Sequence, residues 1–177
     1  YVTSSAVYED NPTKVVKCRE KSEGQLGILD VKYFYPYEET YKVRECTVYD
    51  CIWEIGASAF LGQNELVTAN INSGITTIGA SAFSGCTKLS NITLPSNLRV
   101  ISASAFEGCS SLQGANVPQY VTRLNDSVFK GCTSLSNVTL PTNLRSLGVS
   151  TFENCTSLQS ITIPSGVTTI PNKCFYN

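Results

Sequence analysis

The sequence predicts a solenoid of stacked 23-residue coils, built mainly of parallel β-structure with short helical or 3-10 turns. A phenylalanine returns every 23 residues, an apolar–polar alternation that ends in proline lies between the phenylalanines, and a Gly-Cys pair follows three of them. A fixed period on the order of 20 to 50 residues is typical of proteins whose units bury their apolar faces only by stacking. The recurring phenylalanines are Phe60, Phe83, Phe106, Phe129, Phe152 and Phe175.

The first element of each repeat is a segment of the form Leu-x-x-Ile-x-Leu-Pro, as in residues 89–95. Its second half alternates apolar and polar residues, which predicts a half-buried strand, one in each coil of a parallel sheet. Because proline donates no N–H to a β-ladder, a proline at the same position ends each strand at the same height. These prolines are Pro95, Pro118, Pro141 and Pro164.

A second apolar pair follows the proline, Leu98 and Ile101 in one repeat, and predicts a second strand or an extended turn on the other side of the coil. A serine then stands two residues before each of the first five phenylalanines. We expect its hydroxyl to cap a single helical turn, which a glycine then ends. The serines are Ser58, Ser81, Ser104, Ser127 and Ser150, and the glycines are Gly85, Gly108 and Gly131.

Six of the eight cysteines occupy repeat positions: Cys86, Cys109, Cys132 and Cys155 share one, Cys174 takes one that alanine holds elsewhere, and Cys46 takes the inward position of Ile92. A position shared with small apolar residues predicts a buried structural thiol. A metal site is the alternative, but the chain has no histidine and no Cys-x-x-Cys pair to complete one. The remaining candidates for a disulfide are Cys18 and Cys51, which would join the N-terminal segment to the first coil.

Composition argues against several classes of function. Without histidine the chain cannot form a Ser-His-Asp or Cys-His catalytic group, and it has no phosphate-binding loop or carboxylate pair. We therefore expect no enzyme, no cofactor and no metal. The net charge of −1 and the absence of a strong basic cluster argue against nucleic acid. No apolar run approaches the roughly 20 residues of a membrane span, so no membrane insertion is expected.

The chain divides into an N-terminal cap region, residues 1–42, and an array of about six coils, residues 43–177. The cap is rich in charge and tyrosine, and segments 15–18 and 26–31 are predicted to be β-strands. Its aromatic residues either cover the first coil or form a binding surface. The array ends two residues after Phe175, which predicts truncation at the C-terminal end or self-association through an open coil.

The combined spacing of Leu-x-x-Ile-x-Leu-Pro, Ser-Ala-Phe and Gly-Cys resembles the BspA-like, or treponemal-type, leucine-rich repeat. The resemblance covers about residues 43–177 and implies a leucine-rich repeat solenoid. The family's members are secreted or surface-anchored proteins of host-associated bacteria and some parasitic protists. The resemblance thus implies an extracellular or cell-surface location and a role in adhesion, including binding of extracellular matrix proteins.

In leucine-rich repeats the long sheet lines a concave surface, so the polar residues between its apolar positions are candidate contacts for a protein or glycan. The alternatives are that these short polar residues only suit stacked strands, and that the chain is a structural spacer with no ligand of its own. Arg99, Arg123 and Arg145 lie away from this surface and are interpreted as a solvated face. The candidate residues are Thr68, Asn70, Asn91, Thr93, Asn116, Asn137, Thr139, Ser160 and Thr162.

Overall fold

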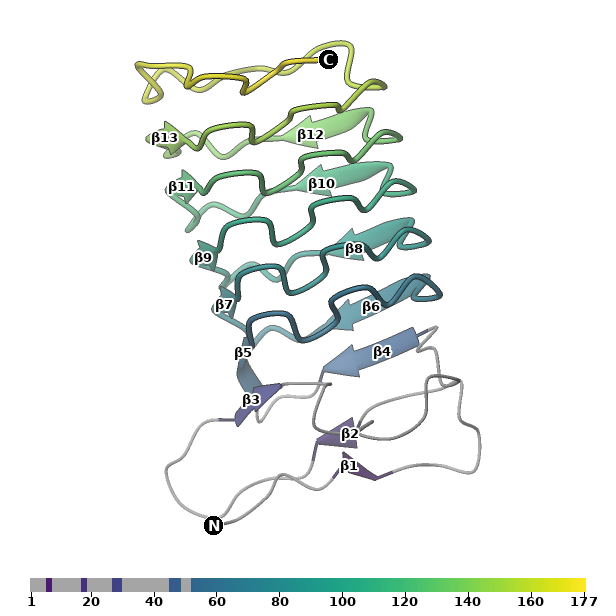
Figure 1. Cartoon of the computed structure of the whole chain (residues 1–177). Coiled ribbons are helices and arrows are strands. Elements are labelled where there is room, and N and C mark those ends of the chain that lie inside the picture. The colour runs from purple at the N-terminus through teal and green to yellow at the C-terminus, as the bar shows by residue number, and fades with distance from the viewer. Residues whose placement is uncertain (1–5, 8–16, 19–26, 30–44, 49–51) are drawn as a thin grey trace.

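The computed structural model describes residues 6–7, 17–18, 27–29, 45–48 and 52–177, with side chains from Trp53 onward. They form a parallel β-solenoid of about four turns with coils of about 23 residues, stacked one above another (Figure 1). Most of the predicted cap region, residues 1–42, lies outside the described residues. Its predicted strands at 15–18 and 26–31 contain two short strands of the structure, β2 (Lys17–Cys18) and β3 (Gly27–Leu29).

The predicted parallel sheet is confirmed. Each strand pairs with residues 23 positions further along, so that Asn91 in β8 lies opposite Thr68 in β6. The alternation also follows the prediction, because in β8 and β12 the central residue is buried while its two neighbours are exposed. The strands on this side of the coil are β4 (Glu45–Val48), β6 (Thr68–Ile71), β8 (Asn91–Thr93), β10 (Gly114–Asn116) and β12 (Asn137–Thr139).

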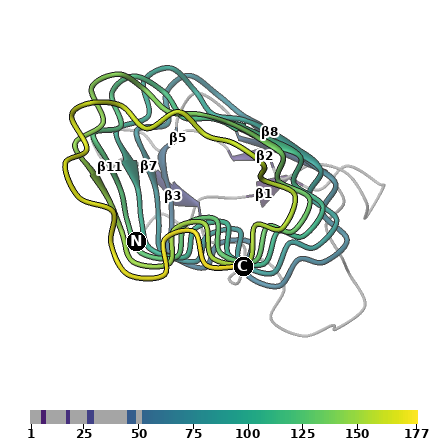
Figure 2. The same ribbon diagram turned by 90° about the horizontal axis from the view of Figure 1, so that it is seen from above.

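A second set of parallel strands follows the first set along the chain, as the second apolar pair predicts. Seen along the stack, it occupies a different side of each coil from the first set (Figure 2). Its strands are β5 (Ile52–Ile55), β7 (Thr77–Ile78), β9 (Val100–Ile101), β11 (Arg123–Leu124) and β13 (Ser146–Leu147), and β3 pairs with β5. Near the N-terminus β1 (Ala6–Val7) pairs with β2 in antiparallel fashion.

The phenylalanine column forms the centre of the core. Successive rings stack with centroids 5.0 to 5.6 Å apart and planes within 10° of parallel. Phe60 to Phe129 are fully buried, and so are Leu89, Leu98 and Ile101 of the two apolar patterns. The column therefore joins all six repeats through one continuous apolar contact, as expected of units that bury surface only by stacking.

The predicted serine cap and helical turn are wrong. All five serines have φ between 53° and 57°, in the left-handed region, whereas an N-cap residue has an extended backbone. No helix is assigned between residues 52 and 177, and the segment is a series of turns. The glycine prediction holds, since Gly85, Gly108 and Gly131 have φ of 72° to 74°.

Hydrogen bonds between coils explain the turn conformation. The N–H groups of Ser104, Phe106 and Gly108 donate to carbonyls 22 residues ahead, on the next coil, at 2.7 to 2.9 Å. The alternate N–H groups, such as that of Glu107, donate to carbonyls three residues back. A helix would direct all these donors along its own axis. The turn, with left-handed residues at Ser104 and Gly108, instead satisfies hydrogen bonds both within the coil and to the next coil.

The last coil departs from the others. The predicted strand at Ser160–Thr162 is not formed, and no strand is assigned after β13 in the described chain. In this structure the last coil has a neighbouring coil on one side, so a strand in it would form hydrogen bonds along one of its two edges. Ile170, Phe175 and Tyr176 are exposed on it. Self-association through this coil stays a prediction.

Candidate functional site

The nine candidate residues form a polar surface, here called the strand face; seven lie in β6, β8, β10 and β12, and Ser160 and Thr162 follow in the last coil. Eight of the nine are exposed and Thr68 is half-buried. Between them Ile92, Ala115 and Val138 point inward and are buried. The sheet therefore presents two columns of short hydroxyl and amide side chains that repeat once in each coil.

A depression of about 360 Å³ interrupts the strand face at β10. It exists because Gly114 stands where neighbouring coils carry Asn91 and Asn137. The depression brings together five of the predicted residues, and Thr68, Asn70, Ser160 and Thr162 do not line it. The five are Asn91, Thr93, Asn116, Asn137 and Thr139.

Packing does not require the glycine at this position. A Cβ atom on Gly114 would meet only the carbonyl oxygen of Asn137, at 3.5 Å, which is an ordinary contact. By contrast, a Cβ on Gly79 would lie 2.5 Å from the backbone nitrogen of Ala57. Gly114 is absent from the predicted set, although its lack of a side chain in a column of Thr, Asn and Ser was the signal for it.

The depression is neutral and can form hydrogen bonds in both directions. Its amides supply donors and acceptors, and the hydroxyls of Thr93 and Thr139 can do either. No charged residue lines it. Such a site suits uncharged polar groups, namely hydroxyls and amides, and offers nothing that would activate a nucleophile.

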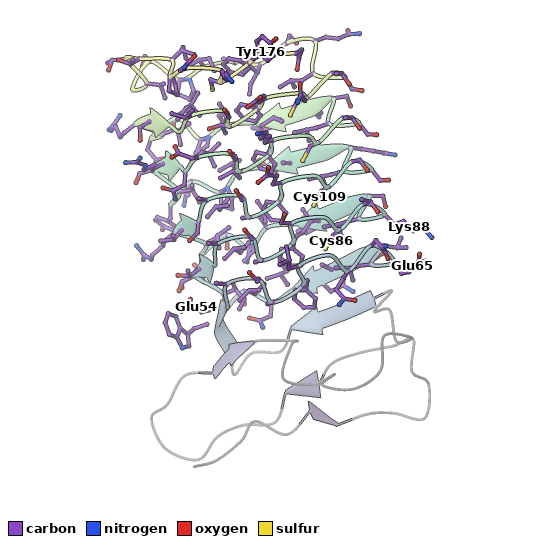
Figure 3. The ribbon with its side chains drawn as sticks, viewed as in Figure 1. Glu54, Glu65, Cys86, Lys88, Cys109 and Tyr176 are labelled. Carbon is purple, nitrogen blue, oxygen red and sulfur yellow. The ribbon has the colours of Figure 1, made fainter. Side chains whose placement is uncertain are left out.

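The charged side chains of the described residues lie elsewhere, and two lysines are paired between coils. The Lys88 ammonium contacts the Glu65 carboxylate at 2.7 Å, and both lie at the same edge of the stack (Figure 3). Lys130 lies 3.6 Å from Glu153. A hydrogen bond from Ser150, with Lys130 and Lys173 nearby, lowers the pKa of Glu153.

The repeated cysteines are core residues, as predicted. Each thiol of the Cys86 column donates to the carbonyl of a phenylalanine 26 residues earlier, at 3.1 Å. Burial raises the pKa of Cys86 and of Cys155 to about 12, so these thiols stay protonated and poorly nucleophilic. Among the described residues, no three His, Cys, Asp or Glu side chains are grouped so as to hold a metal ion.

Cys51 and the side chain of Cys18 lie outside the described residues, so the predicted disulfide stays a prediction. Within the part of the chain that the structure describes, no helix has the length and apolar character needed to cross a bilayer.

Several solved structures resemble this fold. A leucine-rich cell-surface protein from Faecalibacterium prausnitzii has a TM-score of 0.62 and 26% identity over 70% of this chain and 40% of its own. A leucine-rich repeat protein from Eubacterium ventriosum has a TM-score of 0.58 and 29% identity over 79% of this chain and 44% of its own. The pneumococcal vaccine antigen PcpA has a TM-score of 0.60 and 24% identity over 74% of this chain and 36% of its own. This similarity supports the fold alone. The chain thus spans less than half the length of each.

No curated protein matches the chain. Residues 53–177, however, match the BspA type leucine rich repeat region in six copies. These copies coincide with the stacked phenylalanines, the buried thiols and the two sets of strands. The chain belongs to the BspA-type leucine-rich repeat family.

Proposed function

We propose that this chain is a non-enzymatic interaction module of a cell-surface or secreted protein, adhesin-like, and that its strand face binds a protein or glycan. The observation that carries the proposal is the depression at Gly114. It is a neutral, hydrogen-bonding hollow that backbone packing does not require. A purely structural sheet would gain side-chain contacts from a residue larger than glycine there.

The extracellular location is part of the same proposal. It is supported by the similarity to the F. prausnitzii protein, which is described as a cell-surface protein. Extracellular matrix proteins and glycans are the partners that this location and the family suggest. Both offer many repeated amides and hydroxyls.

A single contact with the strand face should be weak. The surface has no aromatic or arginine anchor among its candidate residues, and such anchors dominate tight interfaces. Repetition compensates for weak contacts, because linked sites raise the effective concentration of the second contact. We therefore expect a measurable affinity mainly for partners that carry several copies of the recognised group.

The proposal is tested by screening the chain against immobilised matrix proteins and neutral glycans, and then repeating each positive result with Gly114→Asn. This change fills the depression with the side chain that flanks it, and its Cβ fits without a clash. The matched control is Thr122→Asn, an exposed threonine next to β11 on the other set of strands. Loss of binding by the first variant alone supports the strand face.

Thr93→Glu and Thr139→Glu extend the test, since each places an uncompensated charge on a wall of the depression. Unchanged binding by all three strand-face variants, with native circular dichroism, would refute the proposed site. Absence of any ligand in the screen would favour the spacer hypothesis. The continuous stack supports that alternative, because inter-coil hydrogen bonds hold the coils in a single rod.

A further inference from the structure

Three arginines project from the second set of strands, one from each of three successive coils. Arg99 directly precedes β9, Arg145 directly precedes β13, and Arg123 is the first residue of β11. All three are exposed, and none has an acidic partner within 4.0 Å among the described residues. Lys88 and Lys130, by contrast, are each paired with a glutamate.

Two of the arginine side chains reach equivalent places on the next coil. The guanidinium carbon of Arg99 lies 5.2 Å from the ring centroid of Tyr120, a cation–π contact. Arg145 extends over Gly166, where an added Cβ would lie 2.5 Å from its Nη1. Positions 120 and 166 are equivalent, two repeats apart, so both side chains reach the same corner of the next coil.

The surrounding charges leave this corner positive. Asp126 is the acidic residue closest in sequence to Arg123, and its carboxylate accepts the N–H of Val149 at 2.8 Å. Glu54 lies in β5, three strands away from β11. Strands in a sheet are about 4.8 Å apart, so the two equivalent arginines stand about 10 Å apart along the stack, with Arg123 on the coil between them.

We propose that this arginine corner, formed by Arg99, Tyr120, Arg123 and Arg145, binds a linear polysaccharide that carries carboxylate or sulfate groups. Guanidinium groups match the planar, bidentate geometry of such anions. A linear anionic chain laid along the stack would meet one guanidinium in each coil. The half-exposed ring of Tyr120 offers an amphipathic surface for a sugar ring.

The same corner is poorly suited to an acidic peptide. A peptide strand binds a sheet through free edge N–H and C=O groups, and here those groups are already bonded between coils. The N–H groups of Arg99 and Arg145, for example, donate to the carbonyls of Thr76 and Thr122 at 2.9 and 2.8 Å. The site is also separate from the strand face, so this inference goes beyond the proposed function.

The test uses heparin oligosaccharides as the sulfated probe, hyaluronan oligosaccharides as the carboxylated probe, dextran as the neutral control and polyglutamate as the peptide control. Binding is measured by titration calorimetry at low and at physiological ionic strength. We expect heparin or hyaluronan to bind the native chain, more weakly as salt rises, and dextran not to bind. Tighter binding of polyglutamate, equal binding of dextran, or no binding of either anionic probe would overturn the proposal.

A matched pair of variants separates specific recognition from net charge. Arg99→Gln, Arg123→Gln and Arg145→Gln together should weaken binding roughly tenfold or more. Lys88→Gln, Lys130→Gln and Lys173→Gln remove the same three charges elsewhere and should change it by less than about twofold. Equal loss in both triple variants would refute the assignment.

Three single variants complete the test. If the triple arginine variant does not fold, the single changes Arg123→Gln and Arg145→Gln carry the same test, each with a severalfold loss expected. Gly114→Asn should leave polysaccharide binding intact, since it alters only the strand face. A loss caused by Gly114→Asn would move the site away from the arginine corner and overturn the inference.

Discussion

Replacing Phe106 with leucine measures how much the phenylalanine column contributes to stability. The ring is fully buried and stacks on two neighbours, Phe83 at 5.4 Å and Phe129 at 5.6 Å, with planes within 8° of parallel. Each aromatic pair contributes about 0.5 to 1.5 kcal/mol beyond burial, and the space left by the smaller side chain costs about 1 kcal/mol more. We therefore expect Phe106→Leu to lower the free energy of unfolding by about 2 to 4 kcal/mol.

The control is the same substitution at the end of the column. Phe175 has one described stacking partner, Phe152 at 5.4 Å, and is 37% exposed, so Phe175→Leu should cost about 1 kcal/mol. Both free energies come from urea unfolding followed by circular dichroism. A repeat array can lose two-state behaviour, so coincidence of the circular dichroism and Trp53 fluorescence transitions is checked first. Equal costs for the two variants would refute the argument that double stacking governs stability.

Three other predictions concern the backbone and the thiols. Gly79→Ala should destabilise the fold by about 1 to 3 kcal/mol, because its Cβ would clash with the backbone at Ala57. The control Gly114→Ala should change stability by less than about 0.5 kcal/mol. Similar urea midpoints for the two variants would contradict this prediction. Ser104→Val should cost about 1 to 2 kcal/mol, because φ of 56° disfavours a β-branched residue, whereas thermal melts should show Ser104→Gly to be nearly neutral. The free energy of unfolding should fall as pH rises from about 9 to about 12. The Cys86 thiol loses its proton near pH 9 in the unfolded chain, whereas burial keeps it protonated to about pH 12 in the folded chain. In urea titrations at several pH values, Cys86→Ala should flatten this decline by up to about 1.4 kcal/mol per pH unit, and an unchanged slope would show that the thiol does not titrate in this way.

Much of the fold could be predicted from local pattern. The apolar–polar alternation at residues 91–93 predicted β8 and its exposed faces, and the shared cysteine and alanine positions predicted buried thiols. The turn at Ser104 could not be predicted in this way. A serine before an apolar residue is also typical of a helix N-cap, and the acceptor of its N–H lies 22 residues ahead, on another coil.

The sequence by itself determined the 23-residue period, the two strands of each coil and the buried columns, because each follows from a repeated pattern of apolar residues that must face inward. The tertiary structure decided what the surface offers. The depression at Gly114 depends on the side chains of the coils above and below it, and the arginine corner on guanidinium groups that reach the next coil. Both arise from neighbours one coil away in space, which the pattern within a single repeat does not specify.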